Sequence, residues 1–232
     1  MKKIVMFILL MVILPINVLA TDFSLNDTDM QITFDESEWY VFTPDNILDN
    51  PELEELGISY DYMVDTFEEN GAYLDAILFF SNSDDYIEVF VRKTRIEDVI
   101  NLNNYDKSEI EELGKALAEE QGADYEVYQN DYSFVKLEYQ DMGFYLNEYV
   151  TVINGDGYSI TAQKPYEFVN EDELRVKELI DSIEFDVDES LKEPSRVDWY
   201  KIFRYAIIGA CSGALIVAIF VTMRKNKKNN ED

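Results

Sequence analysis

Carboxylates are the side chains of this sequence from which catalysis could be built. The 232 residues include 48 Asp and Glu, one Cys and no His, so Ser-His-Asp triads and His-ligated zinc are excluded. Two opposed carboxylates can hydrolyse a glycosidic bond, but among so many acidic residues no spacing singles out a pair. We therefore interpret the acidic residues as a solvated surface. We predict that the protein is not an enzyme and has no catalytic residue.

Two short acidic stretches come nearest to a metal site. Asp27-x-Asp29 and Asp186-x-Asp188 each place two carboxylates one residue apart, as calcium ligands can be. Neither stretch has the glycine and the distant glutamate of an EF-hand loop. Asn154 to Gly157 is a turn sequence, and no basic residue supports it as a phosphate cradle. The sequence therefore predicts no metal site and no cofactor, and at most incidental cation binding.

Hydrophobic segments lie near both ends of the chain. The uncharged run Tyr205 to Met223 is long enough to span a bilayer, at about 28 Å for a rise of about 1.5 Å per residue. We predict a transmembrane helix at 204–223 and a basic cytoplasmic tail at 224–232. Residues 1–20 have the pattern of a signal peptide cut after Ala20, with an uncleaved anchor as the alternative.

The predicted membrane helix carries a spacing typical of helix pairs. Gly209 and Gly213 form Gly-x-x-x-Gly, with Ser212 beside them, and small residues let two helices approach closely. These three residues are a candidate helix-dimer face, through which the chain could form a homodimer. Cys211 lies in the same segment, so the rest of the chain must fold without an intrachain disulfide.

Charge is concentrated between Thr21 and Tyr200. This stretch holds 46 acidic and 11 basic residues, a net charge of −35, while the remainder of the chain carries +6. An acidic domain is repelled by nucleic acid and by anionic lipid. We therefore expect no nucleic-acid partner. A cationic partner, or simple solubility, remains as the meaning of the charge.

Turn and cap residues divide the middle of the chain into helices and strands. We predict an N-terminal extension at 21–29, a domain at 30–186 and a linker at 187–203. Helices are expected after Asn50, after Ser59, behind a Ser108–Glu111 capping box, and from Asn170 with Glu173 reaching back. Apolar alternation predicts strands at 31–34, 39–43, 74–80, 87–91, 135–140, 144–153 and 158–162.

The strand pattern indicates an α+β fold, with an antiparallel sheet covered by helices. Strands that are apolar on both faces imply such a cover, and the tight hairpin at Asn154 to Gly157 implies antiparallel pairing. Leu137 is expected to face the core. Lys136, on the opposite face, is expected to tolerate substitution.

Several stretches, taken in order, resemble those of a known superfamily: Ile32-Thr33-Phe34, Trp39-Tyr40-Val41, Tyr86-Ile87-Glu88-Val89, the hairpin Tyr149 to Thr161, and Leu179 to Phe185. Over residues 30–185 the chain resembles PsbP-like domains, a superfamily that includes the DcrB-like and LpqN-like bacterial envelope proteins and a Ran-binding nuclear import factor. The resemblance implies an α/β/α sandwich that serves as a binding or assembly module. The fused membrane anchor departs from the photosynthetic members.

These observations lead to one functional expectation and one alternative. We expect a non-catalytic extracytoplasmic binding or assembly module, anchored in the cell membrane by a single pass, whose partner is an envelope protein or a ligand. The alternative is a carboxylate-based hydrolase that acts on cell-wall polymer.

Overall fold

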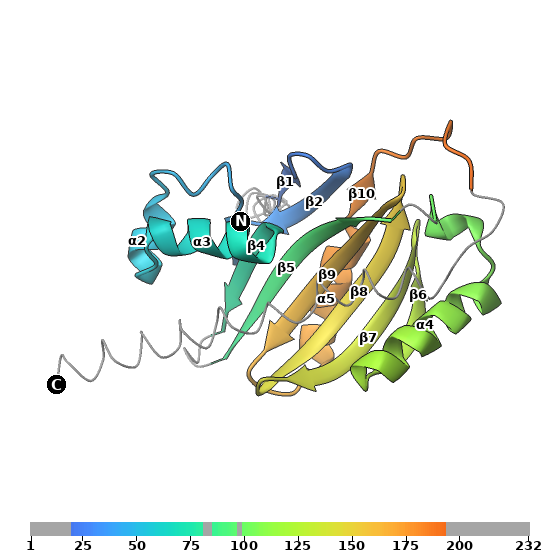
Figure 1. Ribbon diagram of the computed structural model, residues 1–232. Helices are drawn as coiled ribbons and strands as arrows, with labels where there is room; N and C mark the ends of the chain where they lie inside the picture. Colours follow the sequence, from blue (N-terminus) through green and yellow to red (C-terminus); the bar gives the residue numbers. More distant parts are fainter. Residues whose placement is uncertain (1–19, 81–84, 97–98, 194–232) are drawn as a thin grey trace, which may run out of the picture.

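A computed structural model describes residues 20–80, 85–96 and 99–193 (Figure 1). The larger of its two sheets has the strand order β3-β4-β5-β9-β8-β7-β6, and the smaller has the order β1-β2-β10. Every pair is antiparallel, which confirms that prediction. The strands are β1 Ala20–Ser24, β2 Met30–Asp35, β3 Trp39–Phe42, β4 Ala72–Phe79, β5 Tyr86–Arg95, β6 Asp124–Gln129, β7 Ser133–Asp141, β8 Phe144–Ile153, β9 Asp156–Lys164 and β10 Glu184–Phe185.

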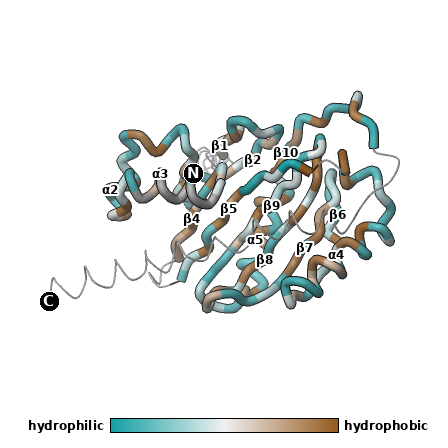
Figure 2. Tube along the Cα trace, viewed as in Figure 1, coloured by the Kyte–Doolittle hydropathy of each residue, from teal (hydrophilic) through white to brown (hydrophobic). Residues whose placement is uncertain are grey.

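Helices cover both faces of the large sheet (Figure 1). On one face, which we call the α5 face, α5 (Asn170–Asp181) and the small sheet pack on Val89 and its same-side neighbours. On the other face, α3 (Tyr60–Asn70) packs near β4, while α4 (Lys107–Gln121) packs on β6 and β7. Two short helices, α2 (Pro51–Leu56) and η1 (Leu102–Asn104), complete the described part. Figure 2 shows hydrophobic residues along the strands between these layers.

Capping residues explain where the helices begin. Asn50 accepts a hydrogen bond from Glu52 N–H and starts α2, as predicted. The capping box of α4 is Asp106 with Glu109, so the predicted Ser108–Glu111 box is wrong. Ser108 is already within the first turn, and its hydroxyl donates to Asp106 Oδ1.

The start of α5 also differs from the prediction. Asp172, rather than Glu173, reaches back and accepts a hydrogen bond from Val169 N–H. Glu173 instead crosses to the sheet, where it accepts from Lys136 Nζ at 3.0 Å and from Asn147 Nδ2 at 2.8 Å. Asp172 also binds the sheet, since it accepts a hydrogen bond from Lys164 Nζ at 2.5 Å.

Lys136 does not lie on a tolerant face. Leu137 is buried against α4, as predicted, but Lys136 is also buried, because α5 covers the opposite face. Its ammonium lies 2.5 Å from Glu138, 3.0 Å from Glu173 and 3.6 Å from Glu126. The sequence expectation for Lys136 is therefore wrong.

Several segments outside the predicted elements are ordered parts of the domain. Residues 20–24 form β1, paired with β2, where a plain extension was expected. Residues 124–129 form β6, an edge strand that was missed. The first residues of the expected linker also hold to the domain, because Glu193 accepts hydrogen bonds from the N–H groups of Ile100 and Asn101.

The two hydrophobic terminal segments fall outside the described residues. The predicted signal peptide, the predicted membrane helix at 204–223 and its Gly209, Ser212 and Gly213 all lie there, except that Ala20 is described. Among the helices that the structure does describe, none combines the length and apolar character needed to span a bilayer.

Candidate functional site: a groove beside the edge strand

A groove of about 760 Å³ opens at the start of β3, which is an edge strand of the large sheet. We call it the β3 groove. Its lining comes from the turn before β3, from α2, from the end of β4 and from α5. The lining residues are Glu36, Ser37, Glu38, Trp39, Tyr40, Glu52, Glu55, Leu56, Leu78, Phe79, Phe80 and Arg175.

Local sequence explains how α2 shapes one wall of the groove. Its apolar residues Leu53 and Leu56 pack into the core beneath α3, so the helix is held against the sheet. Glu52 and Glu55 lie on the groove side of the same helix. Gly57 ends α2 after six residues with φ of 74°, a left-handed conformation that glycine adopts without strain. The wall is therefore short and acidic.

Aromatic residues form part of the groove's lining. The rings of Tyr40 and Phe79 meet edge to face with centroids 5.9 Å apart, and both residues are half-buried. Trp39 is buried on the other side of β3, where its ring contacts Phe34. Half-buried ring faces beside carboxylates are a setting that attracts cations.

Negative charge exceeds positive charge in the groove. Its lining contains four Glu and one Arg. Arg175 is already engaged, since its guanidinium lies 2.6 Å from Glu38 and 3.6 Å from Glu171. Burial raises the pKa of the Glu52 carboxyl, and the charges of Glu36 and Glu55 raise it further. A cation placed between these carboxylates would relieve their repulsion.

A second group of carboxylates is buried in the sheet, beneath α3. Asp75 on β4 and Glu88 on β5 are 1% and 2% exposed. Burial raises the pKa of Asp75 to about 7, although a hydrogen bond with Glu88 opposes the rise. Burial and the charge of Asp75 raise the pKa of Glu88, which accepts a hydrogen bond from Gln163 at 2.9 Å. The hydrogen bond between the two acids lowers the pKa of Asp75 and raises that of Glu88, so protonation is favoured at Glu88.

Glu148 on β8 continues this polar strip along the same face. It is 1% exposed and accepts hydrogen bonds from Ser159 at 2.5 Å and from Tyr139 at 3.0 Å. Burial raises its pKa, while these two hydrogen bonds lower it. Asp75, Glu88 and Glu148 are not lining residues of the β3 groove. They therefore do not supply that groove with a general acid.

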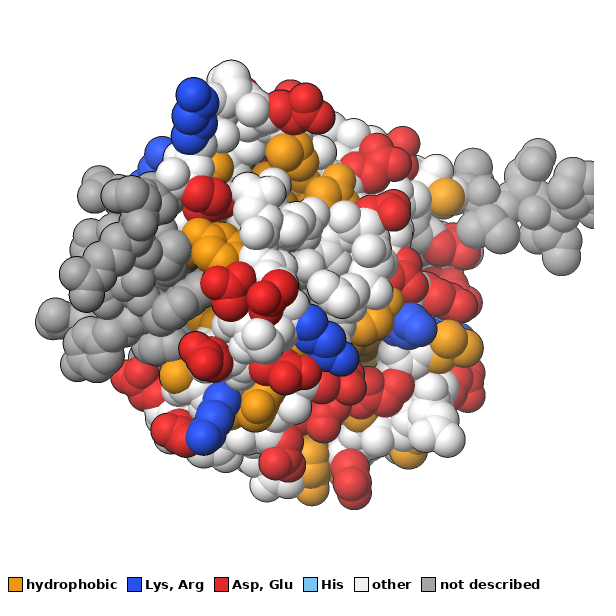
Figure 3. Space-filling view, turned by 90° about the vertical axis from the view of Figure 1, so that its right-hand side faces the viewer, with side chains coloured by type: hydrophobic (Ala, Val, Ile, Leu, Met, Phe, Trp, Pro, Cys, Tyr) orange, Lys and Arg blue, Asp and Glu red, His pale blue; other side chains and the backbone are white. Residues whose placement is uncertain are grey.

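These buried acids were not predicted, because the acidic residues were interpreted as a solvated surface. A signal was available, since Asp75 lies between Leu74 and Ala76 and Glu88 between Ile87 and Val89, in strands apolar on both faces. The remaining carboxylates fit the prediction better. Figure 3 shows one side of the molecule, with Asp and Glu side chains spread across it and few Lys or Arg between them.

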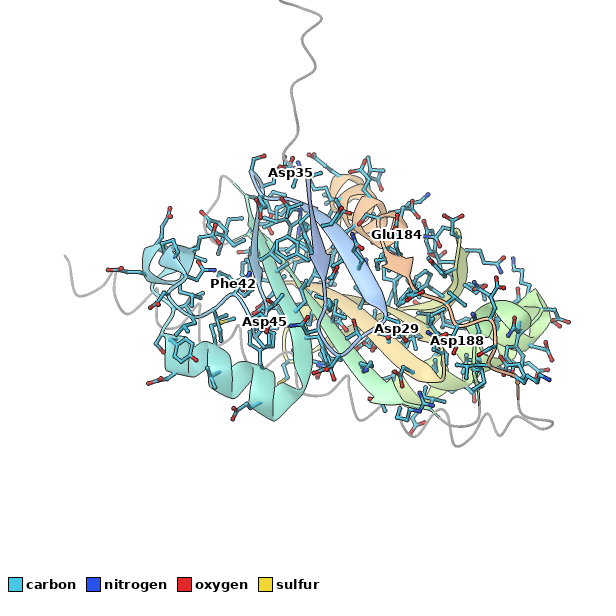
Figure 4. All side chains as sticks on the ribbon, turned by 90° about the horizontal axis from the view of Figure 1, so that it is seen from above. Asp29, Asp35, Phe42, Asp45, Glu184 and Asp188 are labelled. Carbon is cyan, nitrogen blue, oxygen red and sulfur yellow. The ribbon has the colours of Figure 1, made fainter. Side chains whose placement is uncertain are left out.

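The two stretches considered for calcium come together at the other end of the sheet. Asp29 and Asp188 lie near one another in Figure 4 and line a cavity of about 780 Å³. Asn154 joins them, since its Nδ2 donates to Asp29 Oδ2 and its Oδ1 accepts from Asp188 N–H. Within the described ranges, no group of three acidic side chains is placed to hold a metal ion.

Comparison with known proteins gives similarities to solved structures but not to known sequences. No family model matches the sequence, and no curated protein matches it. The solution structure of cyanobacterial PsbP (CyanoP) from Synechocystis sp. PCC 6803 is similar over 72% of this chain and 92% of that chain, at 11% sequence identity and a TM-score of 0.36. This similarity accompanies the PsbP-like resemblance of the sequence, but at this TM-score it decides nothing about family or function.

Proposed function

We propose that the protein is a non-catalytic binding or assembly module on the outer side of the cell membrane, and that the β3 groove takes a cationic segment of an envelope partner. The predicted signal peptide and membrane helix support the location. The groove itself carries the proposal, because it combines half-buried rings with four Glu and one engaged Arg. Acidic residues that only keep a protein soluble can lie anywhere on its surface. Four Glu gathered in one groove instead suggest that the charge binds a partner there.

Peptide binding to the full-length protein in detergent tests the proposal. The probe is a fluorescein-labelled peptide of sequence Thr-Lys-Thr-Lys-Thr-Lys-Thr, followed by anisotropy at 150 mM salt. We expect binding to the wild type, and at least tenfold weaker binding to the double variant Glu52→Gln and Glu55→Gln.

The control for this experiment removes the same charge elsewhere. Glu112 and Glu120 are exposed on α4, so Glu112→Gln with Glu120→Gln lowers the net charge equally. This control should retain wild-type affinity. Equal weakening in both double variants would show that the peptide senses only overall charge, and would refute the groove as the binding site.

The alternative, a carboxylate-based hydrolase of cell-wall polymer, draws on one observation. Glu52 has a raised pKa in an open groove that also holds Glu36, Glu38 and Glu55, and a general acid needs such a setting. Release of soluble fragments from purified cell wall by the wild type, lost in Glu52→Gln, would favour the hydrolase over the binding module.

A further inference from the structure

The backbone of β3 offers the groove a second kind of recognition. Phe80 N–H donates to Asp85 across the hairpin, toward β5, and strand backbone groups alternate in direction. The backbone N–H and C=O of Leu78 therefore also point toward β5, and those of Ile77 point toward β3. Tyr40 lies opposite Ile77, so Tyr40 pairs with β4. Trp39, one residue earlier, turns its N–H and C=O to the free side of the sheet.

The next part of this edge is closed by the protein itself. Asn46 Nδ2 donates to Val41 C=O at 2.9 Å, and Asn46 Oδ1 accepts from Thr43 N–H at 2.7 Å. Both contacts agree with the alternation, since Val41 and Thr43 share the direction of Trp39. Among the described residues, no hydrogen bond reaches Trp39 N–H or C=O from the free side. The open part of this edge is therefore at Trp39, which also lines the β3 groove.

We infer that the β3 groove binds an extended segment of a partner protein as an added antiparallel strand, in which basic residues alternate with neutral ones. This inference rests on the proposed function and specifies how the partner binds. Strand addition to a free sheet edge is a common mode of peptide recognition. We expect the added strand to be antiparallel, because all pairs of neighbouring strands in this sheet are antiparallel.

The two sides of the groove set the side-chain pattern of the added strand. Trp39 points to the α5 face, where Arg175 lies, and Tyr40 points to the face that carries α2 with Glu52 and Glu55. A partner residue directly opposite Trp39 exchanges two backbone hydrogen bonds with it and has its side chain on the α5 face. Its two neighbours point to the acidic wall. The neighbours are therefore the basic positions.

Backbone methylation of the same peptide tests this inference in the full-length protein. In Thr-Lys-Thr-Lys-Thr-Lys-Thr, the Lys side chains are expected at the acidic wall, so the Thr N–H groups face β3. One peptide is N-methylated at the backbone amides of its three Lys residues, and the other at the backbone amides of its last three Thr residues. Both changes leave the charge of the peptide unchanged. We expect methylation at the internal Thr and C-terminal Thr to weaken binding at least tenfold, and methylation at the three Lys to change it less than threefold.

The outcomes separate this inference from the proposed function. If both methylated peptides bind as the parent does, or both lose binding equally, the added strand is refuted while the cation-binding groove stands. If the parent peptide binds the wild type no better than it binds the Glu52→Gln, Glu55→Gln variant, the proposed function fails and the strand inference fails with it. The opposite selectivity, with loss only on Lys methylation, also refutes the predicted alternation.

Discussion

Neutralising Asp75 should change how the stability of the domain depends on pH. Asp75→Asn keeps the shape of the side chain and removes its titration. An acid whose pKa is raised by folding stabilises the native state most at pH values below its unfolded pKa, and this contribution is lost as the pH rises through the folded pKa. For Asp75 these limits are 3.8 and about 7. The wild type should therefore lose stability between pH 4 and pH 7 relative to the variant.

The size of the effect follows from the same pKa values. Each pKa unit corresponds to about 1.4 kcal/mol, so a rise from 3.8 to about 7 gives roughly 4 kcal/mol at most. Because each of the two buried acids affects the pKa of the other, their titrations are coupled, and the contribution of Asp75 alone is smaller, on the order of 2 kcal/mol. Only part of this range is accessible, since the sequence pI is about 4.1 and the protein is expected to precipitate near it.

Urea unfolding between pH 5.0 and pH 7.5 measures the difference. A fragment of residues 21–198 is suitable, because it contains no Cys and no His and should fold without metal or reductant. Its one tryptophan, Trp39, is buried in the core and reports unfolding by fluorescence. We expect the wild type to lose about 1–3 kcal/mol more than Asp75→Asn over this range. Asp131→Asn, at an exposed turn, is the control and should follow the wild type. If the free energy of unfolding changes equally with pH in the wild type and in Asp75→Asn, the raised pKa of the buried Asp75 is refuted.

Three further predictions use other parts of the fold. Leu137→Asp should lower the free energy of unfolding, measured in urea, by several kcal/mol, because it buries an unpaired carboxylate. Lys136→Asp should have an effect of similar size, because it places a carboxylate beside Glu138 and Glu173. A small effect of Lys136→Asp would mean that α5 does not cover this face. Glu193→Gln should loosen the segment around residue 193, because the carboxylate accepts hydrogen bonds from Ile100, Asn101, Asn104 and Tyr105, which outweigh its burial and lower its pKa. Limited proteolysis at neutral pH should cut the variant faster there than the wild type, and equal cutting would contradict this role of Glu193. The melting temperature of the 21–198 fragment should rise as sodium chloride increases from 0.01 M to 0.1 M, since the Debye length falls from about 30 Å to about 10 Å; a much larger rise with calcium at matched ionic strength would contradict the absence of a calcium site.

Local signals in the sequence were sufficient for most elements of the fold. Asn50 and Gly57 set the ends of α2, and Gly122 ends α4 in a left-handed conformation, all as predicted. Asn154 and Gly155 make the two-residue turn between β8 and β9. These residues act through their own backbone preferences, which do not depend on distant contacts.

The missed strands lacked such signals. β6 is largely exposed, and its sequence Asp-Tyr-Glu-Val-Tyr-Gln offers little apolar alternation. It becomes a strand because β7 provides hydrogen-bonding partners along its full length and α4 packs against it. β1 similarly depends on pairing with β2. Tertiary context decides these two segments, so periodicity within them could not have identified them.

The β3 groove could not be predicted, because its parts are distant in sequence. Glu38 and Glu52 belong to a turn and a helix, while Arg175 comes from α5 near the end of the domain. In the sequence, Glu52 is indistinguishable from the other acidic residues of α2. Only the packing of Leu53 beneath α3 turns Glu52 toward the edge of the sheet.

The environment of each carboxylate, rather than the number of carboxylates, decides what it can do. Asp75 and Glu88 are enclosed by the sheet and α3, and desolvation favours their protonated forms, so they contribute less charge than composition suggests. Glu52 and Glu55 border an open cavity, where water keeps the charged form accessible and a partner's ammonium group can reach them. A count of acidic residues treats the two pairs alike. The structure separates them by burial, and the proposed binding of a cationic partner rests on the second pair.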